Sequence, residues 1–127
     1  MKRDMDLIRE LLLKLEALPM RRGGIVLIKA DDEEVQISGY EVDQIDYHLS
    51  LIKEAGLIDT GGAGAMGGYG FRRLSWSGHD FLDSVRSPDV WDRTKQAASA
   101  AGGFTVELLV FAAKSYLEGK IKGFIGG

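Results

Sequence analysis

The sequence predicts an α+β fold in which a mixed domain, residues 1–87, is followed by a helical extension, residues 88–127. Three observations predict it. Several stretches repeat apolar residues at helical spacing, short β-branched runs lie between them, and a glycine-rich segment separates two of these runs. The composition, 45% hydrophobic and 28% charged over 127 residues, is typical of a folded globular protein.

Composition also excludes several classes of function. The chain has no cysteine, which rules out disulfides, thiolate metal sites and a cysteine nucleophile. Acidic residues stand where a secretion signal needs an apolar run, and no stretch approaches the roughly 20 apolar residues that span a bilayer. We therefore expect a cytoplasmic protein without membrane association. The net charge of -3 disfavours non-specific binding to nucleic acids.

The first third of the chain predicts a helix and two strands. The helix has apolar residues at helical spacing, at Met5, Ile8, Leu12 and Leu15. We expect it to end at about Leu18, because Pro19 follows. Residues 25–28 form a short β-branched run, and residues 35–37 alternate with period two after an acidic turn. These two runs are predicted to be short strands.

The middle third predicts a helix followed by a β-hairpin. Residues 41–55 have apolar side chains at helical spacing. Gly56 follows them, and glycine favours the left-handed backbone conformation that often ends a helix. Residues 57–58 and 71–74 are predicted to be extended. Between them, residues 60–70 are too rich in glycine to hold regular structure. This pattern predicts a hairpin with a long, mobile tip.

The last third predicts three helices. Ser75 is a plausible N-cap for a helix that ends before Pro88, and a second helix follows over about residues 89–100. The last helix is predicted over about 105–117, with a frayed end over 119–127. Trp76 and Trp91 are expected in the core as large amphipathic anchors.

The last helix is apolar on more than one side. Such breadth indicates burial either within this chain or against a partner chain, and we favour a homodimer. The expected dimerisation residues are Val106, Leu109, Val110, Ala113 and Leu117.

The order of these elements resembles that of a winged helix. Residues 47–58, a helix that ends in Gly-Leu-Ile, resemble the recognition helix of bacterial winged-helix regulators. Residues 73–78, Arg-Leu-Ser-Trp-Ser-Gly, resemble the entry from the last wing strand into the following helix. One departure is that residues 19–40 leave no obvious room for the separate helix that precedes the recognition helix in DNA-binding members, unless it is reduced to a turn near Gly39-Tyr40.

A more specific resemblance is to the domain of unknown function 2513 family of small bacterial and prophage proteins. The stretches that carry it are residues 1–9, 47–58 and 74–83, with Arg86 and Val90-Trp91. The resemblance spans about residues 1–95. It implies a fold and a genomic setting, and it implies no activity.

Two hypotheses for function remain open. The first is a DNA-binding transcriptional regulator of phage or mobile-element type that binds double-stranded DNA. Its side chains would come from the second helix and the wing, at Gln44, His48, Lys53, Tyr69, Arg72 and Arg73. Gln can pair with adenine, and Arg with guanine or phosphate. The alternative is a protein–protein interaction module with a winged-helix fold that does not bind DNA, since the same helix carries acidic residues that repel phosphate.

Catalysis and cofactor binding have little support. Residues 62–67 match Gly-x-Gly-x-x-Gly, but a strand follows, where a dinucleotide loop must open a helix. His48 and His79 have no third residue at metal-ligand spacing. We therefore expect no enzymatic activity, no metal and no cofactor.

Overall fold

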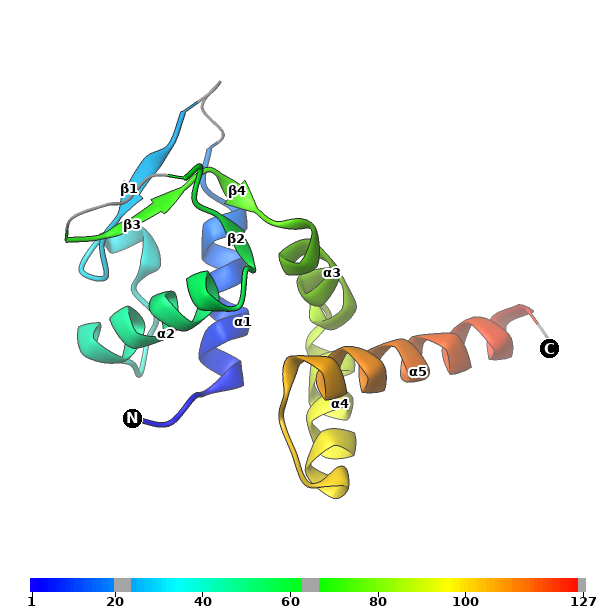
Figure 1. Cartoon of the computed structure of the whole chain (residues 1–127). Coiled ribbons are helices and arrows are strands. Elements are labelled where there is room, and N and C mark those ends of the chain that lie inside the picture. The colour runs from blue at the N-terminus through cyan, green and yellow to red at the C-terminus, as the bar shows by residue number, and fades with distance from the viewer. Residues whose placement is uncertain (20–23, 63–66, 126–127) are drawn as a thin grey trace. The chain divides into compact units, whose positions relative to one another are not determined.

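The computed structural model describes residues 1–19, 24–62 and 67–125 and has an α+β fold. The described residues form five α-helices, one 3-10 helix and four short strands (Figure 1). They divide into two compact units, residues 1–79 and residues 80–127. The four strands of the described residues all belong to the first unit, and the regular elements described in the second unit are helices.

Helix α1 (Met5–Glu16) forms because an acidic cap precedes an apolar stripe. The Asp4 carboxylate accepts hydrogen bonds from the backbone N–H groups of Asp6 and Leu7 at 2.9 and 3.3 Å. The helix ends two residues before the predicted Leu18. Its stripe packs against α2 (Val42–Glu54), the 3-10 helix η1 (Glu33–Val35) and strand β4 (Arg73–Leu74). The fully buried leucines are Leu7, Leu11, Leu12 and Leu15.

The predicted strand at residues 35–37 is wrong. Strand β1 (Val26–Ile28) is followed by a 3-10 helix, η1 (Glu33–Val35). The side-chain amide of Gln36 donates to the carbonyls of Ala30 and Asp32, at 2.7 and 2.9 Å. These bonds close the chain into a turn, and local side-chain to backbone bonding of this kind competes with extended structure.

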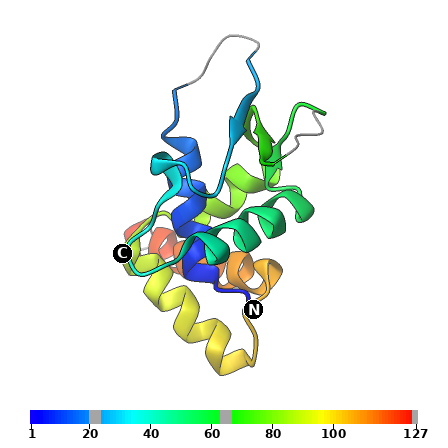
Figure 2. The same ribbon diagram turned by 90° about the vertical axis from the view of Figure 1, so that its left-hand side faces the viewer.

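Helix α2 confirms the predicted helix and its stop. At its start, the backbone N–H of Glu41 donates to the side-chain oxygen of Gln44, which forms part of a capping box. At its end, Gly56 has a positive φ of 70°. Both views show α2 lying across α1, with β1 and β3 near one end of the two helices (Figures 1 and 2).

The predicted hairpin is confirmed in part. Strand β2 (Ile58–Asp59) pairs antiparallel with β4 (Arg73–Leu74), as expected. Strand β3 (Tyr69–Phe71) pairs instead with β1, so the end of the glycine-rich segment is ordered. The centre of the predicted mobile tip, residues 63–66, lies outside the described residues.

Helix α3 (Trp76–Val85) follows β4 directly. The Ser75 hydroxyl accepts a hydrogen bond from Gly78 N–H at 3.1 Å, which confirms the predicted N-cap. Trp76 is 86% exposed, so its expected core position is wrong. The helical period places Trp76 opposite the buried face of α3, which carries Phe81 and Leu82.

Helices α4 (Pro88–Ala101) and α5 (Val106–Ile125) pack against each other in the second unit. Trp91 is buried, as expected, and meets Phe81 edge to face with ring centroids 6.4 Å apart. The predicted frayed end is wrong over residues 119–125, which are helical. Lys120 Nζ lies 3.9 Å from the Asp89 carboxylate of α4, and this ion pair joins the C-terminal half of α5 to α4.

Candidate interaction surface of the wing and helix α2

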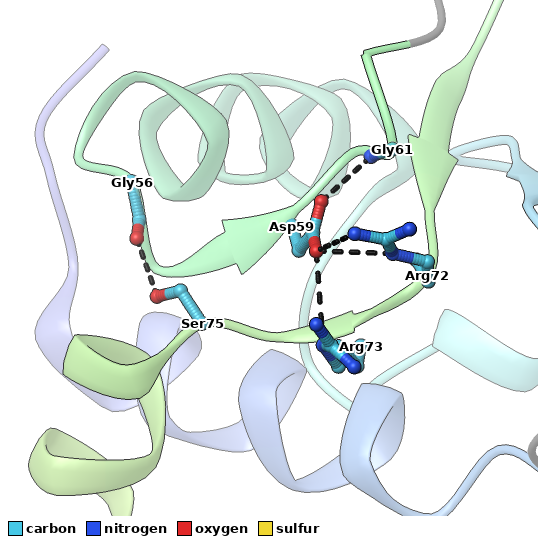
Figure 3. A network of polar contacts seen from close by, with 6 residues as sticks. All are labelled: Gly56, Asp59, Gly61, Arg72, Arg73 and Ser75. Carbon is cyan, nitrogen blue, oxygen red and sulfur yellow. Dashed lines mark hydrogen bonds and ion pairs between the residues drawn. The ribbon is translucent and has the colours of Figure 1, made fainter.

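Two arginines share one carboxylate in the segment predicted to form a wing, strands β2 to β4, which is called the wing below. Because β2 and β4 pair antiparallel, Asp59 lies opposite Arg73. Arg72 donates to Asp59 Oδ2 from Nη2 at 2.7 Å and from Nε at 3.1 Å, and Arg73 Nε lies 3.7 Å from the same oxygen. The other oxygen accepts the Gly61 N–H at 2.8 Å (Figure 3). Two basic groups therefore converge on one acidic group.

The electrostatics of this cluster keep Asp59 ionised. The Gly61 N–H, and then the Arg72 guanidinium, hold the pKa of the Asp59 carboxyl below its ordinary value. The ionised carboxylate offsets part of the positive charge that Arg72 and Arg73 would present to a ligand. Beside the cluster, the Ser75 hydroxyl donates to the Gly56 carbonyl and joins the end of α2 to the start of α3 (Figure 3).

His48 lies inside the molecule. Its side chain is 1% exposed, with Nε2 accepting the Asp4 N–H at 2.8 Å and Nδ1 2.7 Å from the Gln44 carbonyl. Since Asp4 N–H is a donor and the Gln44 carbonyl an acceptor, the ring is neutral with its proton on Nδ1. This geometry gives His48 a structural role, joining α2 to the cap of α1.

The hydroxyl of Tyr69 connects the wing to α2. It donates to both the carboxylate and the backbone carbonyl of Asp46, each at 3.0 Å. Burial, together with the Asp46 carboxylate, raises the pKa of Tyr69 to about 12. The Tyr69 hydroxyl therefore remains a hydrogen-bond donor to α2 at pH values where a free tyrosine would ionise.

The remaining predicted residues lie apart from the wing arginines. Gln44 is half-buried and contributes to the capping box, whereas Lys53 is exposed in the last turn of α2. Among the described residues, no hydrogen bond or ion pair joins either side chain to Arg72 or Arg73. The structure thus brings together the two arginines, and separately Tyr69 and α2, but not the full predicted set.

Negative charge dominates the exposed face of α2 and its cap. Lys53 is outnumbered by four exposed acidic residues, Glu41, Asp43, Asp46 and Glu54. Asp46 and Asp59 stand among the basic groups of the helix and the wing. Among the residues that the structure describes, the positive groups of α2 and of strands β3 and β4 are therefore interrupted by acidic groups, whereas phosphate binding requires a continuous basic surface.

Sequence reasoning did not identify Asp59 as part of this surface. The available signal was the register of the predicted hairpin, because oppositely charged residues across an antiparallel pair attract each other. Its register could not be fixed from the sequence, since the segment between the strands is long.

The predicted dimerisation residues are all at least half-buried within the chain. Leu109 and Ala113 are fully buried, and the other three are half-buried. In contrast, Phe111 on the same helix is 71% exposed. The apolar surface that α5 presents to solvent is therefore different from the predicted one.

Two further properties concern membranes and metals. Within residues 1–19, 24–62 and 67–125, no helix is long and apolar enough to cross a bilayer. Over the same ranges, no three His, Cys, Asp or Glu side chains gather closely enough to hold a metal ion.

Comparison with known proteins identifies the family. The family described as "Hypothetical protein (DUF2513)" matches residues 2–104. A relative from Haemophilus influenzae, described as "Uncharacterized protein", is 34% identical over 97 residues, which cover 75% of this chain and 76% of the relative. No solved structure matches the chain significantly. The match over residues 2–104, together with this relative, shows that the chain belongs to the DUF2513 family.

Proposed function

We propose that this chain is a cytoplasmic, non-enzymatic winged-helix protein that acts as a protein–protein interaction module. Strand pairing supports the winged-helix assignment. Strands β3 and β4 are separated by Arg72 alone, and they pair with β1 and β2 respectively. The chain from Tyr69 to Leu74 therefore pairs first with β1 and then with β2, as the last strand of a wing would.

The connection before α2 supports a role other than DNA binding. DNA-binding helix-turn-helix proteins place a helix across the backbone before the recognition helix. In this chain, the corresponding connection has a single 3-10 turn, η1, which starts with the exposed residues Glu33 and Glu34. Carboxylates at this position would repel the phosphates.

The observation that carries the proposal is the acidic face of α2. A helix in the major groove lies between two rows of phosphates, so uncompensated carboxylates on its exposed face oppose docking. The same carboxylates suit a basic protein surface, where complementary potentials steer association and reject wrong partners. We therefore assign α2 as the contact surface and a basic protein segment as its ligand.

Charge reversal on α2 tests this assignment in the native host. In-cell crosslinking of the full chain should recover a protein partner, and Asp43→Lys/Glu54→Lys should lose it. Both side chains are exposed, and their changes spare the Asp46–Tyr69 bond. The matched control is Glu33→Lys/Glu34→Lys, which reverses the same charge on η1 and should retain the partner. Equal recovery with both double variants would contradict an α2 interface.

A second candidate is DNA binding by a regulator of phage or mobile-element type. It is favoured by the exposed side chains of Arg73, the first residue of β4, and of Arg72, which directly precedes it. On this hypothesis phosphate must compete with the Asp59 carboxylate for both guanidinium groups. DNA affinity would then fall with rising salt and with Arg72→Ala/Arg73→Ala.

A further inference from the structure

The two long helices of the second unit leave an apolar groove open between them. It has a volume of about 730 Å³ and a mostly apolar lining, which also includes the polar side chains of Arg93, Gln96, Ser115 and Tyr116. Ala97 and Ala101 contribute from α4, and Leu108 and Ala112 from α5. Small residues at these positions leave room for a large side chain from outside.

A large apolar side chain that could fill such a groove, Phe111, lies at the edge of the groove itself. Phe111 lines the groove and is 71% exposed, so most of its ring points away from its own chain. A surface with both a hole and a projecting knob is self-complementary, because a two-fold axis places each knob over the other copy's hole. Symmetry thus indicates a second copy of this chain as the occupant.

Charges on either side of Phe111 favour one orientation. Glu107 lies four residues before it and Lys114 three residues after it, and both are exposed on α5. Antiparallel pairing centred near Phe111 brings Glu107 of each copy close to Lys114 of the other. Parallel pairing would instead align like charges, which repel.

We propose that the chain forms an antiparallel homodimer in which Phe111 of each copy enters the α4–α5 groove of the other. The proposal does not depend on what α2 binds. Ten residues line the groove, fewer than the roughly 20–30 per side of a standard stable interface. The dimer is therefore expected to dissociate in the micromolar range.

Sedimentation velocity of the full chain across the micromolar range tests the proposal. The wild-type chain should pass from monomer to dimer, and Phe111→Asp should remain monomeric at every concentration. The control is Phe124→Asp, which introduces the same charge at a 91% exposed phenylalanine outside the groove. It should dimerise like the wild type, and circular dichroism should show equal helix content in all three proteins.

The orientation has its own test. Glu107→Lys should weaken the dimer at least tenfold, and Glu107→Lys/Lys114→Glu should restore it, since the swap recreates both ion pairs. A wild-type chain that stays monomeric would overturn the proposal and leave the groove to another protein. A dimer that survives Phe111→Asp, or that is broken equally by Phe124→Asp, would also contradict it.

Discussion

His48 shows how a polar side chain on a proposed binding helix serves the interior instead. Its Nε2 accepts a hydrogen bond from the N–H of Asp4, which lies 44 positions earlier in the sequence, and its Nδ1 bonds to the Gln44 carbonyl of its own helix. Asp4 itself caps α1 and accepts a hydrogen bond from Tyr40 at 2.8 Å. Burial and then the Asp4 hydrogen bond raise the pKa of Tyr40 to about 12, so the Tyr40 hydroxyl keeps donating at pH values where a free tyrosine would ionise.

Removing the ring should therefore destabilise the fold. His48→Leu keeps a side chain of similar bulk but leaves Asp4 N–H without its acceptor, which costs about 2 kcal/mol of unfolding free energy. His79→Leu is the control, because His79 is exposed, and it should change stability by less than about 0.5 kcal/mol. Urea unfolding followed by circular dichroism measures both. A His48→Leu protein that is as stable as the wild type would contradict the structural role of His48.

At the scale of elements, a close approach of backbones fixes how α3 begins. A Cβ atom added to Gly78 would lie 2.0 Å from the Leu57 carbonyl oxygen, which also accepts the Ser75 N–H at 3.0 Å. No side chain fits between the start of α3 and the segment that enters β2. Gly119 in α5 is the opposite case, since an added Cβ would meet nothing within 4 Å.

The same substitution at these two helical glycines should have opposite effects. Gly78→Ala should destabilise the protein by about 2 kcal/mol, because the overlap with backbone exceeds any gain in helix propensity. Gly119→Ala should stabilise it by about 0.5–1 kcal/mol, because alanine is the better helix former and has room. Thermal unfolding of the two variants and of the wild type measures both changes in stability. Equal shifts of the same sign would contradict the packing of α3 against Leu57.

Local pattern predicted the helices better than the strands. Apolar spacing and capping residues located α1, α2 and α4 to within about two residues, because those signals are local. The pairing of β1 with β3 joins residues more than 40 positions apart, and no local pattern encodes it. The alternation at residues 35–37 was too short to outweigh the side-chain bonds of Gln36.

For the candidate site, the sequence predicted where the side chains lie along the chain better than which side chains they contact. Tyr69 lies on β3, Arg73 on β4 and Arg72 between these two strands, yet each makes polar contacts with an acidic residue of the same chain. Trp76 was assigned to the core on its size alone. The face of a helix decides burial, and that face is determined by tertiary packing.

At the scale of the molecule, the two surfaces that we propose for interactions differ in character. The first unit carries the acidic face of α2 beside a wing whose arginines share Asp59. The second unit carries an apolar groove and the exposed Phe111. The electrostatic character of the first surface and the apolar character of the second both suit proteins better than nucleic acids.

Titration of labelled duplex DNA with the full wild-type chain tests this account most directly. Any duplex serves, because phosphate contacts alone support non-specific binding that strengthens as salt is lowered from about 200 to 50 mM. We predict no saturable change in fluorescence anisotropy even at the lowest salt. The contradicting result is binding whose logarithm falls linearly with the logarithm of salt concentration, weakened by Arg72→Ala/Arg73→Ala and not by Arg86→Ala.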